Sequence, residues 1–320
     1  MQETTALDEI DLKIINSLST NCRVPFRNIA STVGITPKAV KTRVNKMISQ
    51  GVIQDFVVLI NPVIFGYEKQ CFLTIRCNNN NPIKDEEIIK RLNLVGDVLA
   101  FAKQLGGSSI FVLVVKSGTE DKIRLLIDLV KPAVVVEPRF VDLMPSSMNV
   151  NISDLKIIRC LLSNARMEIA NIAKEASIST RTVTRRIEMM LQSHFSSFTI
   201  IRGMSSMQLV GFIEFAVVIN INKSFHQYIL KRIYRELQEY LMFISSANQS
   251  EVIFAVFFCA NIPTVDFILK QLVSYEGVEK AELSITTKLT YYQEWLKREI
   301  NKRLRSEEVE ARTRRYSLVK

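Results

Sequence analysis

Two stretches of this sequence place basic, hydroxyl and amide side chains at the spacing of one outward helix face. The first contains Thr36, Lys38, Lys41, Thr42, Arg43, Asn45 and Lys46, and the second contains Thr180, Arg181, Thr184, Arg185 and Arg186. Lysine, arginine and hydroxyl groups bind phosphate oxygens, and asparagine or lysine can recognise the edges of purine bases. The chemistry that these residues predict is binding of double-stranded DNA.

Residues that would support catalysis or metal binding are scarce. The chain has only two histidines, His194 and His226, so a multi-histidine metal site is not available. No Gly-rich phosphate loop, nucleophile triad or carboxylate pair stands out. We therefore predict no catalytic residue, no metal site and no cofactor, and expect that the protein is not an enzyme.

Composition and charge agree with a polyanionic partner. The 320 residues carry 42 Lys+Arg against 32 Asp+Glu, a formal net charge of +10, and 48% of them are hydrophobic. This length predicts two to four domains with large cores. The longest apolar run, Val252 to Ala260, is about half of the roughly 20 residues that cross a bilayer. Five cysteines without a CxxC pair, together with a polar N-terminus, predict a cytoplasmic protein without a membrane span.

The chain is an internal repeat. The segment Asp11 to Ile15 recurs as Asp154 to Ile158, a shift of 143 positions. The same shift matches further pairs along both halves, among them Arg23/Arg166, Arg43/Arg186, Met47/Met190 and Phe72/Phe215. Two copies of one module, about 143 residues each, therefore make up nearly all of the chain.

The first part of each copy predicts a helix-turn-helix. In copy one, a helix capped by Asp8 is followed by a second that ends at Gly34, and Thr36-Pro37 opens a third. The buried stripe of the third helix is predicted to be Val40, Val44, Met47 and Ile48. Residues 52–60 then predict a β wing or a linking strand. The outward face of this third helix, and of its counterpart in copy two, is expected to enter the major groove.

The second part of each copy predicts a ferredoxin-like βαββαβ sandwich, which makes the fold class α+β. The expected elements are 68–77, 83–94, 98–105, 110–116, 119–131 and 133–143 in copy one, and 211–221, 223–239, 241–247, 252–260, 263–275 and 278–287 in copy two. An amphipathic helix is expected at about 289–304, with Trp295 docking it, before a basic tail.

Several strands carry apolar residues at successive positions, which predicts burial on both faces. We therefore expect the two sheets to pair as a pseudo-dimer within one chain, and association of two chains into a homodimer is compatible with this arrangement. The predicted domains are a winged helix-turn-helix at 1–62, a regulatory domain at 63–145, a second winged helix-turn-helix at 146–205, a second regulatory domain at 206–288, and a C-terminal helix and tail at 289–320.

The sequence resembles the Lrp/AsnC (feast/famine) family of prokaryotic transcription regulators. The resemblance rests on Leu7-Asp8, Asp11, Ile14, Leu18, Asn21-Cys22-Arg23, Ile29-Ala30, Val33-Gly34-Ile35-Thr36, Val40, Arg43-Val44, Gly51-Val52-Ile53, Asn61-Pro62 and Phe65-Gly66. It implies a winged helix-turn-helix followed by a regulatory sandwich that pairs sheet to sheet. Usual members carry one copy per chain and dimerise, so this chain resembles a fused dimer.

The resemblance also implies a small-molecule effector, whose identity is unknown. Family members place a Gly-rich turn with an acidic residue near the amino-acid effector; the turn here is Gly106, Gly107, Ser108 and Ser109, without the acid. The corresponding turn of copy two, Asn248 to Glu251, has no glycine, and copy two has His194 where copy one has Gly51. DNA binding is accordingly better supported for copy one than for copy two.

Three other interpretations stay open. The basic helices could be solvated faces of packing helices. The chain also resembles the sirohaem decarboxylases, enzymes on the same fused architecture that have lost DNA binding; here, however, Tyr67, Arg76 and Arg139 are scattered in the sequence and neither histidine clusters with them. Finally, the regulatory domains could serve only as an assembly surface. We favour the DNA-binding regulator.

Overall fold

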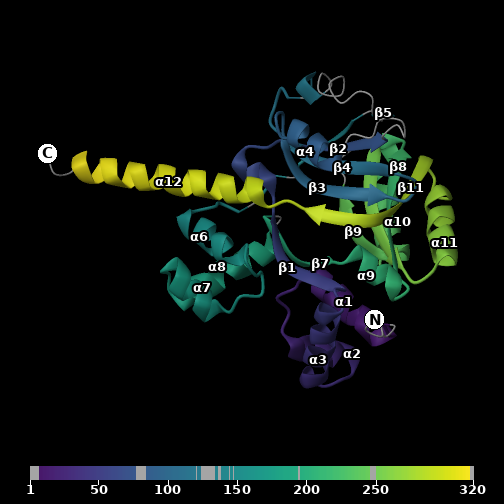
Figure 1. The fold of residues 1–320 in the computed structure, drawn as a ribbon, viewed down its shortest axis with the longest axis horizontal. Coiled ribbons are helices and arrows are strands. Elements are labelled where there is room, and N and C mark those ends of the chain that lie inside the picture. Colours follow the sequence, from purple (N-terminus) through teal and green to yellow (C-terminus); the bar gives the residue numbers. More distant parts are fainter. Residues whose placement is uncertain are drawn as a thin grey trace.

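The structure is a computed structural model that describes residues 7–76, 84–119, 121–123, 134–135, 138–143, 145–146, 148–193, 195–245 and 250–317. Two helix-turn-helix units lie away from the central sheets (Figure 1). The first comprises α1 (Glu9–Thr20), α2 (Phe26–Val33) and α3 (Pro37–Ser49), and the second comprises α6 (Ile152–Leu161), α7 (Ile169–Ala176) and α8 (Thr180–Gln192). This confirms the predicted two-copy fold.

Local capping explains where these helices begin and end. Asp8 and Asp11 form a capping box at the start of α1, and Asn151 and Asp154 form its counterpart at α6. The left-handed conformation of Gly34 ends α2, and Thr36 caps α3 by accepting from the Ala39 amide. The predicted caps at Asp8, Gly34 and Thr36 are all confirmed.

The buried stripe of α3 is narrower than predicted. Val40, Val44 and Met47 are buried, but the Ile48 side chain is 41% exposed. The prediction for Ile48 is wrong, because two short neighbouring helices cover only one side of α3.

A two-stranded ribbon joins the two copies. The antiparallel strands β1 (Ile53–Ile60) and β7 (Ser196–Arg202) pair with each other, so the segment predicted as a wing or linking strand is a linking strand. β1 of copy one pairs with β7, the equivalent strand of copy two, so the two helix-turn-helix units lie around one shared ribbon (Figure 1).

The regulatory units supply the remaining strands. Copy one contains the 3₁₀ turn η1 (Pro62–Phe65), β2 (Lys69–Arg76), α4 (Asp85–Leu92), β3 (Asp97–Gln104), β4 (Ser108–Val115), β5 (Val134–Val135) and β6 (Arg139–Asp142). Copy two contains α9 (Met204–Leu209), β8 (Ile213–Ile221), η2 (Lys223–Phe225), α10 (His226–Glu236), β9 (Leu241–Ser245), β10 (Val252–Cys259), α11 (Ile262–Val273) and β11 (Val278–Tyr291). Most of the helix predicted at 119–131 lies outside the described residues, and the single strand predicted at 133–143 is two short strands that both pair with β2.

The two sheets meet both edge to edge and face to face. The strand order is β5-β2-β4-β3-β11-β8-β10-β9 in the described part of the chain. The 14-residue strand β11 pairs with β8 through its first half and with β3 through its second, so it belongs to both copies. Between the facing sheets, the rings of Phe72 and Phe254 stack with centroids 4.6 Å apart. The expected pseudo-dimer of sheets is therefore present.

The C-terminal helix α12 (Glu294–Ser317) docks on both copies. Trp295 contacts the rings of Phe65 and Tyr67 edge-on, at centroid distances of 6.0 and 5.7 Å, and α12 also packs against α6. The docking prediction for Trp295 is confirmed, but the helix does not begin at Leu289, because residues 289–291 extend β11 along the edge of β3. The distal part of α12 projects away from the body (Figure 1). Among the described residues, no helix is both long and apolar enough to cross a membrane.

Candidate nucleic-acid interface

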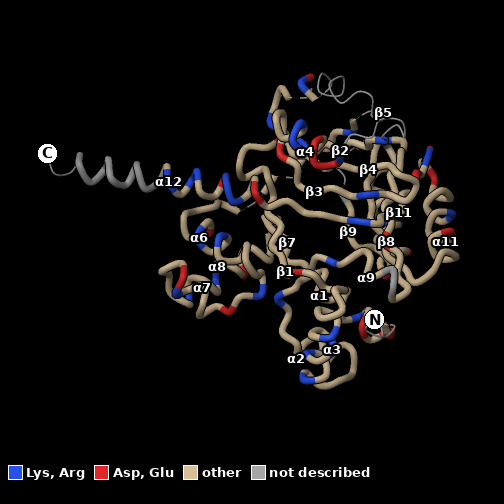
Figure 2. The backbone as a smooth tube through the Cα atoms, viewed as in Figure 1, with Lys and Arg blue, Asp and Glu red and all other residues tan. Residues whose placement is uncertain are grey.

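The outward face of α3 carries the residues that the sequence predicted. Each is exposed and comes from the helix itself or from its cap: Thr36, Lys38, Lys41, Thr42, Asn45 and Lys46. Three of these six are lysines, and α3 contains no acidic residue (Figure 2). The positive end of the helix dipole adds to this field at Thr36. The arrangement is suited to phosphate contacts with one amide, that of Asn45, available for a base edge.

The outward face of α8 differs in charge. Thr180, Arg181, Thr184 and Arg185 are exposed, as the sequence predicted, and Ser179 caps the helix by accepting from the Thr182 amide at 3.2 Å. The exposed residues that the sequence prediction omitted on this helix include Glu188 and Met189. The 143-residue shift could have found them, because it aligns them with Asn45 and Lys46.

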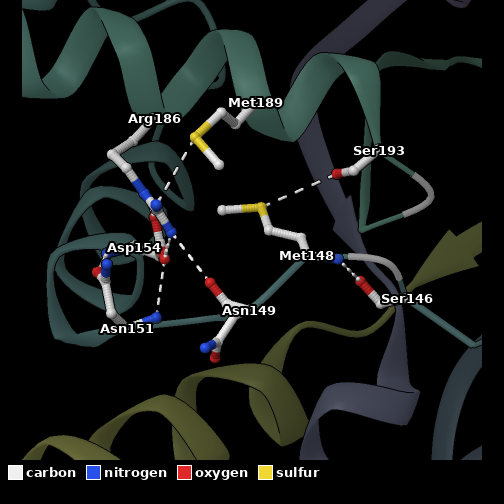
Figure 3. Close-up of polar contacts among 8 residues, drawn as sticks. All are labelled: Ser146, Met148, Asn149, Asn151, Asp154, Arg186, Met189 and Ser193. Carbon is white, nitrogen blue, oxygen red and sulfur yellow. Dashed lines mark hydrogen bonds and ion pairs between the residues drawn. The ribbon is translucent and has the colours of Figure 1, made fainter.

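Arg186 does not belong to this face. Its guanidinium binds the carboxylate of Asp154, with one contact at 2.5 Å, and also donates to the Asn149 carbonyl at 3.2 Å (Figure 3). The Arg186 side chain is 8% exposed and that of Asp154 is fully buried. The prediction that Arg186 contacts DNA is therefore wrong, because an internal ion pair between α8 and α6 holds its charge.

Arg43 occupies the equivalent position in copy one and has the same kind of partner. One guanidinium nitrogen lies 2.8 Å from Asp11 and 2.7 Å from Asp8, at the first turn of α1. The hydrogen bonds to Asp11 and Asp8 raise the pKa of Arg43. Desolvation alone would raise the pKa of Asp8, but the Asp11 amide and Arg43 outweigh it and lower that pKa. Arg43 therefore positions α3 against α1, and its assignment as a direct DNA contact stays a prediction.

A reciprocal pair of arginines fixes the two units to each other. Arg23 donates to the carbonyls of Ala165 and Met167, the latter at 3.0 Å. Arg166, its counterpart 143 residues later, donates to the carbonyls of Cys22 and Val24. We call these four contacts the arginine clasp. Since the clasp and the β1–β7 ribbon both cross between the copies, the relative placement of α3 and α8 is set by the fold.

A second set of contacts connects the first helix-turn-helix to the regulatory sheet. Arg202, at the end of β7, pairs with Glu214 of β8 at 2.8 Å and donates to the Ser19 hydroxyl at 3.2 Å. The Thr199 hydroxyl donates to the Ser19 carbonyl at 2.7 Å. Because Ser19 lies at the end of α1, a movement of β8 would reach the helices that present α3.

The predicted effector turn lies between β3 and β4. Gly106 and Gly107 both have a φ of +87°, which favours glycine, and the Ser109 hydroxyl donates to Asp85 of α4 at 3.3 Å. Ser108 borders a cleft of about 560 Å³ between the two sheets, which Arg76 and Arg139 also line. Asn248 and Gln249 of the corresponding turn in copy two lie outside the described residues.

The histidines do not form a site in the described residues. His226 is buried at the start of α10, where burial lowers its pKa, and His194 lies outside the described residues. No group of three or more histidine, cysteine, aspartate or glutamate side chains that could hold a metal ion occurs within the described ranges.

Comparisons with known proteins match parts of the chain. A family described as winged helix-turn-helix DNA-binding matches residues 7–54 and again residues 150–195. The chain is 33% identical over 122 residues to an uncharacterized HTH-type transcriptional regulator of Pyrococcus furiosus, which covers 38% of this chain and 80% of that protein. It is 32% identical over 109 residues to the regulatory protein AsnC of Haemophilus influenzae, covering 34% of this chain and 71% of that protein.

The comparisons with solved structures include a match over almost the whole length of the chain. The crystal structure of the siroheme decarboxylase NirDL aligns with 93% of this chain and 99% of its own, with a TM-score of 0.50 and 14% sequence identity. At this identity the likeness shows that the two-copy fold is shared.

Proposed function

Because the chain belongs to the Lrp/AsnC family of helix-turn-helix regulators, we propose that it is a transcription regulator that binds double-stranded DNA, with α3 and α8 in the major groove. The observation that carries the proposal is the exposed, acid-free face of α3, held by the Arg43 ion pairs in an orientation that leaves its lysines unobstructed. Lys38, Lys41 and Lys46 contact phosphates, and Thr42 and Asn45 face base edges.

Copy two is expected to contribute less to the affinity for DNA than copy one. The exposed cations of α8 are Arg181 and Arg185, and Glu188 on the same helix repels phosphates. Thr180 and Thr184 supply hydroxyl contacts.

The test is the salt dependence of binding to a labelled mixed-sequence duplex, measured by fluorescence anisotropy. Each lost phosphate contact lowers the log–log slope by about 0.9, so replacing Lys38, Lys41 and Lys46 by glutamine should lower it by about 2 to 3. The matched control replaces three exposed lysines of the regulatory units, Lys90, Lys223 and Lys231, by glutamine. Equal slopes for the two triple variants would contradict the proposal, because both lose the same charge.

A tetrapyrrole-decarboxylating enzyme is the second candidate. It is favoured by the full-length likeness to the siroheme decarboxylase fold and by the cleft between the sheets, where Arg76 and Arg139 could pair with carboxylates. We rank it lower because Arg139 is already paired with Glu282 at 2.7 Å, and because the described histidine, His226, does not line the cleft. A saturable shift of the sirohaem absorption band on adding the protein would favour the enzyme.

The same cleft is the proposed effector site of the regulator. Of the turn residues Gly106, Gly107, Ser108 and Ser109, Ser108 lines the cleft, and the turn connects strands that lead to β11 and from there to β8. A small molecule bound there would act on DNA binding through Arg202 and Ser19. The measurement is the change in DNA affinity on adding individual amino acids, with Ser108→Ala as the variant that should weaken any such response.

A further inference from the structure

The two recognition helices are built on the same frame. Both have 13 residues, begin at equivalent positions 143 residues apart, and are capped in the same way by Thr36 and Ser179. Their buried stripes also correspond, with Val40, Val44 and Met47 matched by Val183, Ile187 and Met190. Each outward position of α3 can therefore be compared directly with one outward position of α8.

Every one of five exposed outward positions differs between the two helices. The pairs are Lys38/Arg181, Lys41/Thr184, Thr42/Arg185, Asn45/Glu188 and Lys46/Met189. Buried and capping positions, by contrast, keep their type. A dimer of identical chains presents the same outward residues on both of its recognition helices, whereas this chain presents two different sets.

The two sets are also held in a fixed order. The arginine clasp and the seven antiparallel pairs from Ile53/Arg202 to Ile60/Ser196 tie the two units together across the molecule. Because both units belong to one chain, neither can be exchanged for a second copy of the other. The result is one recognition surface with two unlike halves, α3 and α8.

We propose that this surface recognises an asymmetric operator, that is, a DNA duplex with two half-sites of different sequence in a fixed order. The inference rests on the proposed DNA binding and extends it to the kind of DNA sequence. Asn45 pairs with adenine in the first half-site, whereas Glu188 accepts from the cytosine amino group in the second. Arg185, at the position of the base-facing Thr42, favours guanine, so the second half-site is richer in G·C pairs.

The role of Glu188 is selectivity. A carboxylate beside phosphates lowers the affinity for DNA in general, but a carboxylate at a cytosine amino group gives a favourable contact to one base pair only.

The first experiment selects tight binders from a pool of randomised duplexes with the full chain. The expected result is a motif of two unlike half-sites, in which protection of both halves is seen by footprinting. A palindrome of two like half-sites, or a motif contacted by α3 alone, would overturn the inference while the regulator proposal survives. Absence of binding to any duplex would overturn both.

Variants of the second helix make the test position by position. Glu188→Asn should change the preference at one base pair of the second half-site from C·G to A·T, by about 10-fold or more. Glu188→Ala is the matched control, because it removes the carboxylate without supplying an amide and should lose the preference without reversing it. Equal changes in affinity for all sequences in both variants would show that Glu188 contributes only charge.

A complete exchange of the outward face is the strongest form of the test. All five residues are exposed, so the fold should tolerate their replacement by the copy-one set: Arg181→Lys, Thr184→Lys, Arg185→Thr, Glu188→Asn and Met189→Lys. The selected motif should then become symmetric. An unchanged asymmetric motif would overturn the inference.

Discussion

The arginine–aspartate pair between the first and third helices occurs in both helix-turn-helix units but in different surroundings. In copy two, Arg186 is 8% exposed and Asp154 is fully buried, whereas in copy one Arg43 is 30% exposed. We expect Arg186→Ala to destabilise the protein more than Arg43→Ala, because Asp154 would be left fully buried without a cation, whereas the Asp11 side chain keeps 8% exposure and Asp8 is exposed.

The expected magnitudes follow from burial. Removing one partner of a buried ion pair costs about 3–5 kcal/mol, and Asp154 retains one hydrogen bond, from the Asn151 amide at 2.8 Å, so the lower end applies. In copy one the arginine is partly exposed, so its ion pairs contribute about 1 kcal/mol, and Asp8 and Asp11 keep their capping contacts without Arg43. The two variants should thus differ by about 2 kcal/mol in the free energy of unfolding.

The assay is urea unfolding followed by the fluorescence of Trp295. This residue is the only tryptophan in the chain and begins α12, the helix that packs on α6 of the second unit. The midpoint should fall without a change in slope if the folded and unfolded states keep their compactness. In addition, the double variant Asp154→Leu/Arg186→Met should recover most of the loss, because apolar residues of similar size tolerate the buried position. Equal destabilisation by the two single variants would refute this reasoning.

Three further outcomes are expected. Ser177 ends α7 in the left-handed region with a φ of 56°, and its counterpart in copy one is Gly34. Ser177→Gly should therefore stabilise the second unit by about 1 kcal/mol in urea unfolding, and Gly34→Ser should destabilise the first. A lower stability of Ser177→Gly would show that the backbone at Ser177 is not strained. Because Arg166→Ala loosens the arginine clasp, it should weaken binding to a duplex with both half-sites more than binding to a duplex with a single half-site, as measured by fluorescence anisotropy. Equal losses of affinity for the two duplexes would show that the clasp does not set the spacing of the two helix-turn-helix units. Burial lowers the pKa of His226, so the unfolded chain binds a proton near pH 6.5 while the folded chain stays unprotonated at this residue, and the free energy of unfolding should fall as the pH drops through that value. In urea unfolding, His226→Asn should show a smaller fall between neutral pH and about pH 5.5. An identical fall in the variant would exclude His226 as the cause.

Two kinds of feature could be predicted from the sequence: the ends of individual helices and the internal repeat. Asp8, Gly34 and Thr36 mark helix ends, because a cap depends only on residues within one turn of it. The shift of 143 positions established two copies without any knowledge of their contacts. The alternation of helices and apolar strands was enough to give the fold class, and the exposed positions of α3 followed from helical periodicity.

Tertiary structure alone decided which cations remain available. Arg43 and Lys41 look alike in the sequence, yet Arg43 meets two aspartates of another helix and Lys41 faces solvent. Likewise, nothing local indicated that β1 pairs with β7, or that residues 289–291 extend a strand along the edge of β3 where a helix was expected. Such contacts join residues far apart in the chain, and their energies depend on how whole elements pack. Local pattern therefore predicts each element, while the partners of its charged side chains and strand edges follow only from the assembled fold.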